Sequence, residues 1–203
     1  KELLARFLRT KSDRIDVFAV DQIWVPRFAK WAIPVDSYLR QTTKKDFLIY
    51  AEKSCTYNDT LVAIPFYIDV ALMYYRKDLI EKLPNAKEIK NSLTKSITWD
   101  EFIKLCKNPI FENNPKFVFQ GDDYEGLICI FKEILSGLNG SLFSDQEINL
   151  NSTEVKKAVE FLIDLIYTYK ISPEDVIRFK ETQSYNFFVE NDAIFLRGWP
   201  GMN

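Results

Sequence analysis

The sequence contains no histidine among its 203 residues. This absence excludes Ser-His-Asp and Cys-His catalysis, because both need an imidazole to move the proton. It also excludes a histidine general base and metal sites rich in imidazole ligands. Enzyme classes that depend on histidine are therefore removed before any motif is considered.

Cysteine is also scarce, with Cys55, Cys106 and Cys129 far apart along the chain. Their spacing does not fit a metal site, and their odd number argues against a disulfide framework. We expect buried free thiols. The chain also lacks the run of about 20 apolar residues that a transmembrane helix requires.

The charges give no strong field of either sign. Lysine and arginine together number 27 and the acidic residues 29, for a formal net charge of −2. This balance favours neither nucleic acid nor anionic lipid as a partner. The hydrophobic fraction of 47% is enough for a substantial core, and 15% of the residues are aromatic. The rings either fill that core or line a site for an uncharged ligand.

The two ends of the sequence have the character of interior segments. There is no signal peptide, residues 1–10 already show helical spacing of apolar residues, and residues 197–203 stop just after a predicted strand. We therefore interpret the chain as an internal fragment of a longer protein.

Hydrophobic periodicity and turn residues predict an alternation of helices and strands. The predicted helices are 1–10, 22–31, 44–54, 77–83, one opening at 98–102, 124–138, 153–169 and 181–190. The predicted strands are 15–20, 61–64, 66–75, 116–119 and 193–196. Thr98 and Glu101 have the spacing of a capping box at the start of their helix. This alternation predicts an α/β fold with parallel strand pairing and right-handed crossovers.

Polar and aromatic residues follow three of these strands, where open α/β sheets bind ligands. Asp21 and Trp24 follow the first; the other two groups are Gln120 to Glu125, with Gly126, and Gly198 with Trp199. Each has a simpler interpretation as well. Asp21 could only cap a helix, Glu125 could only serve a helix dipole, and the tryptophans could be core residues.

A fourth candidate group is Tyr67 and Asp69, within the apolar run from Phe66 to Tyr75. A carboxylate inside an apolar strand must be hydrogen-bonded, paired or turned toward a cleft. Carboxylates together with flat rings suit a sugar, because hydroxyl groups donate to carboxylates and pyranose faces lie against aromatic planes. Asp69 is therefore a predicted ligand residue.

Several segments of the chain resemble one known family. The segment AIPFYIDVALMYYRKDL (residues 63–79), the segment QGDDYEGLICIF (residues 120–131), Thr98-Trp99 with Glu101-Phe102, and residues 188–200 occur in the order and spacing of the family 1 extracellular solute-binding proteins. These are the sugar-binding subunits of bacterial ABC importers. Within that family the sequence resembles the trehalose/maltose-type binders.

The resemblance implies a type II periplasmic-binding-protein-like fold, with two lobes, a central cleft and a hinge crossing near residues 66–67. Residues 1–66 would be part of the amino-terminal lobe and 67–203 most of the second lobe, so the fold would be incomplete. The ligand-binding residues that we expect are Asp21, Trp24, Tyr67, Asp69, Gln120, Glu125, Gly126, Gly198 and Trp199.

The function implied is capture of a sugar, in particular an oligosaccharide, and its delivery to a permease. The expected partners are the sugar and the ABC transporter permease subunits, with no nucleic acid, no metal and no cofactor. A periplasmic or extracellular location is implied, with membrane contact only through a lipid anchor outside these residues. One alternative is a glycoside hydrolase that uses paired carboxylates such as Asp69 and Glu125. Another is a purely structural interaction module.

Overall fold

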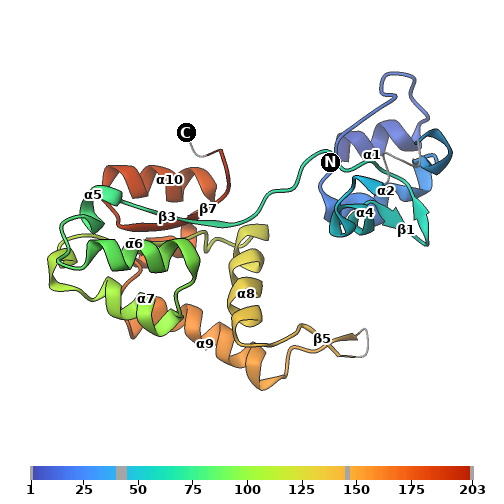
Figure 1. The fold of residues 1–203 in the computed structure, drawn as a ribbon. Helices are drawn as coiled ribbons and strands as arrows, with labels where there is room; N and C mark the ends of the chain where they lie inside the picture. Colours follow the sequence, from blue (N-terminus) through green and yellow to red (C-terminus); the bar gives the residue numbers. More distant parts are fainter. Residues whose placement is uncertain (1, 40–44, 145–146, 202–203) are drawn as a thin grey trace. The chain divides into compact units, whose positions relative to one another are not determined.

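The computed structural model describes residues 2–39, 45–144 and 147–201. The chain divides into two compact units, residues 1–69 and 70–203 (Figure 1). The predicted assignment of residues 1–66 and 67–203 to two lobes of a binding protein stays a prediction. Each unit is described below by itself.

The first unit is mostly helical. Its elements are α1 (Glu2–Arg9), η1 (Gln22–Trp24), α2 (Val25–Phe28), η2 (Ala29–Trp31), η3 (Asp36–Tyr38), α4 (Ile49–Ser54), β1 (Thr56–Tyr57) and β2 (Thr60–Leu61). The predicted helix over 22–31 is present as three consecutive short helical pieces, with Pro26 in the first turn of α2. Phe28 is its main buried side chain, 2% exposed.

The predicted turn at Asn58-Asp59 joins β1 and β2 as a hairpin. Both turn residues have positive φ, 47° for Asn58 and 58° for Asp59. Two successive positive φ angles are typical of the tight turns that match the twist of paired strands. This prediction is confirmed.

The predicted strands over 15–20, 61–64 and 66–75 are largely wrong. Residues 15–20 form no strand, and Val17 is 91% exposed. At these three positions the structure has only the strands Thr60–Leu61 and Leu72–Tyr75, and each of them is paired with another strand. A β-strand depends on a hydrogen-bonded neighbour, and within the described residues nothing pairs with 15–20 or 66–71.

The helix predicted over 44–54 is interrupted: Lys45 is helical, but residues 46–48 are not. Its first residue, Lys44, lies outside the described residues. The helix α4 itself begins at Ile49, because Leu48 is extended, with φ −63° and ψ 134°. The helix 77–83 is likewise shorter, present as α5 (Lys77–Ile80).

The second unit is an α/β arrangement around a three-stranded sheet. Its further elements are β3 (Leu72–Tyr75), α6 (Ala86–Lys95), α7 (Trp99–Cys106), η4 (Pro109–Phe111), β4 (Phe117–Val118), α8 (Glu125–Gly137), β5 (Phe143–Ser144), β6 (Glu147–Ile148), α9 (Thr153–Tyr167), η5 (Glu174–Arg178), α10 (Glu181–Glu190) and β7 (Phe195–Gly198). The predicted helices over 124–138, 153–169 and 181–190 are confirmed, and α6 and the β5–β6 hairpin were not predicted.

The strand order in the sheet is β3-β7-β4, so the last strand lies in the middle. The β4–β7 pair is parallel and the β3–β7 pair is antiparallel. The expectation of parallel pairing is therefore correct for one pair only. Helix α10 lies on one side of the sheet, and α6 and α7 lie on the other (Figure 1).

An aromatic cluster joins α7 to the sheet. The ring centroid of Phe102 lies 4.9 Å from that of Phe195 and 5.2 Å from that of Phe117, and all three side chains are buried. The capping box at the start of α7 is formed as predicted: Thr98 Oγ1 accepts from the Glu101 backbone N–H, and the Glu101 carboxylate accepts from the Thr98 N–H. The cap fixes the start of α7, and Phe102 lies one turn further on.

Among the described residues, none of the helices has the length and the apolar character needed to cross a membrane.

Candidate functional site

The predicted residues of the second unit gather where β4 and β7 end. Gln120 follows β4, while Gly198 ends β7 and Trp199 follows it. Because β4 and β7 are parallel neighbours, their carboxyl ends lie at the same edge of the sheet. The structure therefore brings Gln120, Gly198 and Trp199 to one edge of the sheet, and their role in binding stays a prediction.

Gln120 is completely buried, and both polar atoms of its side chain are hydrogen-bonded within the protein. Its Nε2 donates to Ser184 Oγ at 2.7 Å and to the Arg197 carbonyl at 2.9 Å, and its Oε1 accepts from Arg197 Nη1 at 3.0 Å. A ligand would have to displace these bonds to reach the amide. The geometry therefore argues against a direct ligand contact and gives Gln120 a supporting position.

Arg197 is the central residue of this edge, and the sequence analysis did not select it. It lies in the middle of β7 and is only 3% exposed. Its Nη2 donates to Glu133 Oε1 at 2.6 Å, and its Nε lies 3.4 Å from Glu133 Oε2. A charged residue within the apolar run Ala-Ile-Phe-Leu-Arg-Gly was the signal that could have identified it, by the argument that selected Asp69.

Trp199 is held at three points. Its backbone N–H donates to the Tyr185 hydroxyl at 3.1 Å, and its carbonyl accepts from the Tyr74 hydroxyl at 2.7 Å. The Arg197 guanidinium carbon lies over the indole ring, 4.0 Å from its centroid. The side chain is half-buried, so it is neither a sealed core residue nor a loose surface ring.

Gly198 lies between two tyrosine rings. A Cβ atom at this position would lie 3.2 Å from ring atoms of both Tyr185 and Tyr74. Tyrosine rings of the protein itself therefore occupy the space next to this glycine. Tyr74 and Tyr185 are two further residues of the site that the sequence analysis missed.

At the start of α8, Glu125 is exposed and lies in the first turn, as predicted. Glu125, Cys129 and Glu133 are four residues apart, so they follow one face of the helix, the face that meets Arg197. Cys129 is half-buried, and burial raises the pKa of its thiol. Cys55 and Cys106 are buried free thiols, as expected, and burial raises their pKa too.

Gly126 is buried beneath the ring of Tyr124. A Cβ atom there would clash with the Tyr124 hydroxyl, so a protein ring again fills the space next to the glycine. Burial raises the pKa of the Tyr124 phenol above its usual range, and the nearby Glu181 carboxylate raises it further. The hydroxyl has no hydrogen bond of normal geometry within the described residues.

We expect Gly126→Ala to destabilise the second unit by about 1–3 kcal/mol, because the new methyl group forces the Tyr124 ring out of its position. Gly137→Ala, in the same helix, is the matched control. The nearest atom to its Cβ would be Trp99 Nε1 at an ordinary 3.7 Å, so removal of a helical glycine should be neutral or stabilise by up to about 1 kcal/mol. Urea unfolding measures the free energy of unfolding of both variants. Equal effects of the two substitutions would contradict the packing argument.

The remaining predicted residues belong to the first unit. Asp21 is exposed and stands before η1, but its side chain makes no capping hydrogen bond there. The interpretation of Asp21 as only a helix cap is therefore not supported by its geometry. Trp24 is half-buried, and the Arg27 guanidinium carbon lies 5.2 Å from its ring centroid.

Tyr67 and Asp69 lie in an exposed extended segment before β3. Tyr67 is 73% exposed and its ring contacts Phe66 edge-on, with centroids 5.6 Å apart. The Asp69 carboxylate is exposed and makes no hydrogen bond or ion pair within the described part of the chain. The expectation that Asp69 lies within a strand is wrong, because pairing with β7 begins only at Leu72.

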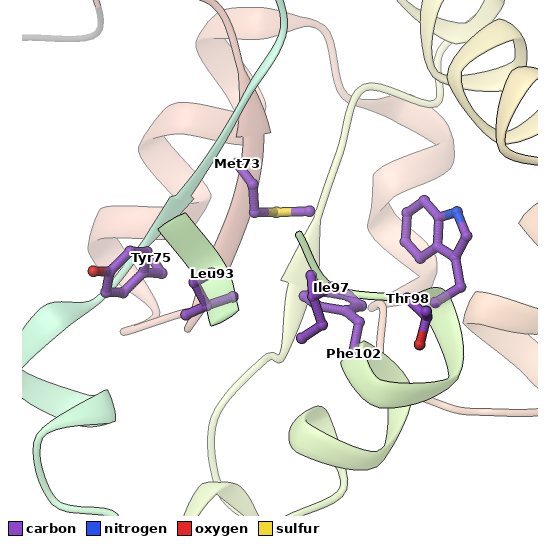
Figure 2. Close-up of a pocket in the computed structure, with 7 residues that line it drawn as sticks. Met73, Tyr75, Leu93, Ile97, Thr98 and Phe102 are labelled. Carbon is purple, nitrogen blue, oxygen red and sulfur yellow. The ribbon is translucent and has the colours of Figure 1, made fainter. Parts of the chain in front are cut away.

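Two hollows border strand β3 in the second unit. One, of about 140 Å³, is lined by apolar side chains of β3, α6 and the start of α7, including Met73, Leu93 and Phe102 (Figure 2). The other, of about 460 Å³, borders Met73, Glu133 and Arg197. Glu133 and Arg197 already bind each other, so neither hollow offers a free set of polar groups for a sugar.

Within residues 2–39, 45–144 and 147–201, no cluster of three or more His, Cys, Asp or Glu side chains could hold a metal ion.

Comparison with known proteins gives relatives of one kind. A probable ABC transporter-binding protein of Deinococcus radiodurans is 26% identical over 201 residues, which is 95% of this chain and 46% of that protein. The maltose-bound structure of T. maritima MalE3 matches with a TM-score of 0.82 and 31% identity, covering 99% of this chain and 50% of that one. The GacH receptor of Streptomyces glaucescens matches with a TM-score of 0.75 and 20% identity, over 98% of this chain and 49% of that one.

These likenesses confirm the predicted fold class, the α/β fold of the type II periplasmic binding proteins. The chain spans about half the length of the proteins that it matches. The model of one family, the bacterial extracellular solute-binding proteins, matches residues 4–203. The chain therefore belongs to the family of bacterial extracellular solute-binding proteins.

Proposed function

We propose that the protein is the sugar-binding receptor of an ABC importer, which captures its ligand between two lobes and delivers it to a permease. The observation that carries the proposal is Trp199, a half-buried indole fixed at the carboxyl ends of β4 and β7 by Arg197, Tyr74 and Tyr185. A fixed aromatic plane at such an edge suits the apolar face of a sugar ring.

Family membership supports a binding role over an enzymatic one. The alternative of a glycoside hydrolase required a pair of carboxylates across the bond to be cleaved. The family whose model matches residues 4–203 consists of solute-binding proteins, which supports a receptor and gives no support to a hydrolase. The glycoside hydrolase is therefore not retained.

The sugar class proposed is an α-linked disaccharide or a longer oligosaccharide of the trehalose/maltose type. Two observations support it: the 31% identity to a protein whose structure holds maltose, and the resemblance of residues 63–79 to binders of that type. We propose a periplasmic or extracellular location for the same reason. A lipid anchor outside residues 1–203 stays a prediction.

The test is a calorimetric titration of the complete protein with maltose, trehalose, glucose and, as a ligand of another class, glutamate. We expect binding of one of the two disaccharides with a dissociation constant in the micromolar range or below. Binding of glutamate with no response to any sugar would overturn the proposed ligand class.

Within this proposal, Asp69→Ala is expected to weaken sugar binding about ten- to a hundredfold without unfolding the protein. Trp199→Ala is expected to weaken it by loss of ring stacking, roughly 0.5–1.5 kcal/mol, together with the apolar area that the ring buries. A hydrogen bond to a charged group contributes roughly 1.5–3 kcal/mol, and each factor of ten in affinity corresponds to about 1.4 kcal/mol. Asp13→Ala, another exposed carboxylate of the first unit, is the control and should leave affinity unchanged.

The melting temperature and the affinity are measured on the same samples. If Trp199 is only a core residue, its truncation should instead lower stability by roughly 3–5 kcal/mol and leave the affinity of the folded protein intact. Unchanged affinity in both variants would remove Asp69 and Trp199 from the proposed site.

A further inference from the structure

We infer that Arg197 is a positioning residue, which fixes the plane of the Trp199 indole and leaves one chosen face of that ring for the ligand. The inference rests on the proposed function, because it concerns how the stacking surface for the sugar is held. Arg197 itself does not contact the ligand in this account.

The first step is that the guanidinium group of Arg197 cannot rotate freely. Glu133 binds its Nη2 and Nε side, and Gln120 Oε1 binds Nη1 at 3.0 Å. Gln120 is itself fixed by Ser184 and by the Arg197 carbonyl. A planar group bonded along two edges has its plane determined, and Arg197 is only 3% exposed.

The second step is that the fixed guanidinium group orients the Trp199 indole. The guanidinium carbon lies 4.0 Å from the centroid of the Trp199 ring, within the range of a cation–π contact. The backbone of Trp199 is bonded on both sides, through its N–H to Tyr185 and through its carbonyl to Tyr74. The freedom that remains is rotation of the side chain, and the stacked guanidinium restricts it.

The third step concerns the two faces of the indole. One face is covered by the guanidinium group, so a sugar can stack only on the opposite face. The half-buried state of Trp199 leaves part of the ring open for this contact. A lysine at position 197 would keep the charge but lose the plane and the two-sided hydrogen bonding.

The test compares Arg197→Lys with Arg76→Lys in the complete protein labelled with ¹⁵N at the tryptophan indoles. Arg76 is the matched control, an arginine bound to two carboxylates, Asp78 and Asp192, beyond the other end of β3. The chain has four tryptophans, and Trp199→Phe identifies the Trp199 signal by its loss.

We expect Arg197→Lys to shift and broaden the Trp199 indole signal in the absence of sugar, and Arg76→Lys to leave it in place. We also expect Arg197→Lys to weaken sugar binding roughly two- to tenfold, because the freed Trp199 side chain must then be ordered when the sugar binds. A loss of affinity with an unchanged Trp199 signal would overturn the inference, because Arg197 would then act on the ligand directly.

A purely structural role would lower the melting temperature in both lysine variants and leave the Trp199 signal alone, which also contradicts the inference. If Arg197→Lys does not fold, Glu133→Gln decides: it keeps the arginine but weakens its anchor, and the Trp199 signal must shift. If the wild-type protein binds none of the sugars, the proposed function fails, whereas the indole signals still decide whether Arg197 fixes Trp199.

Discussion

Phe102→Ala is expected to lower the stability of the second unit by about 3–5 kcal/mol, the usual cost of emptying a buried phenylalanine site. Phe102 is 2% exposed, and its ring contacts Phe117, Phe195 and Trp99 edge-on, at centroid distances of 5.2, 4.9 and 5.7 Å. Phe117 and Phe195 belong to neighbouring strands, so the cavity would open where α7 meets the sheet.

The matched control is Phe143→Ala, the same chemical change at a side chain that is 58% exposed in the β5–β6 hairpin. Surface substitutions usually change stability by no more than about 0.5 kcal/mol. Urea unfolding followed by circular dichroism compares the two variants. A loss below 1 kcal/mol for Phe102→Ala would show that α7 does not pack on the sheet as described.

Gln120→Ala is expected to cost about 2–5 kcal/mol, because it leaves buried groups without partners. The substitution removes the acceptor for Arg197 Nη1 and the donor to the Arg197 carbonyl, and Gln120 and Arg197 are both buried. Each unsatisfied buried group costs roughly 1–3 kcal/mol. The effect should therefore exceed the loss of packing from a shortened side chain alone.

Gln183→Ala provides the control for Gln120→Ala, since Gln183 lies exposed on α10. Its unfolding midpoint in urea should match the wild type. The original hypothesis for Gln120, direct ligand binding, predicts the reverse for Gln120→Ala: reduced sugar affinity with stability unchanged. Measuring affinity and unfolding together separates support of the site from contact with the ligand.

The helices of the second unit were largely predictable from the sequence. The helix α9 begins at Thr153, as predicted, after the N-cap Ser152, whose Oγ accepts from the Val155 N–H, and α10 has the predicted bounds. Caps and helical periodicity are local features, so they can be read from a few consecutive residues. The helix α6 was missed because its sequence is polar and its side chains are nowhere fully buried.

The strands were less predictable because a strand depends on a partner that is distant in the sequence. Residues 15–20 and 66–71 have the composition of strands but no pairing neighbour within the described residues. The pairing of β7 with both β3 and β4 could not be derived from the composition of any single segment.

The sequence selected some of the residues that lie at this sheet edge, but not how they pack. The sequence located Gln120, Gly198 and Trp199 at one sheet edge, and the structure brings them together. The sequence did not show that the Gln120 amide is hydrogen-bonded to Arg197. Nor did it show that tyrosine rings fill the space next to Gly198 and Gly126. Those facts depend on tertiary packing, which no local pattern encodes.

The position of β7 has a consequence for how the chain acquires its structure over time. The central strand of the sheet follows both of its neighbours along the sequence, and the Tyr74–Trp199 hydrogen bond that flanks it joins residues 125 positions apart. During synthesis, the edges of β3 and β4 that pair with β7 therefore stay unpaired until β7 has been made. Such long-range closure slows folding and prolongs the exposure of strand edges to other chains. A chaperone that shields β3 and β4 during this interval should raise the yield of folded protein more than it alters its final stability.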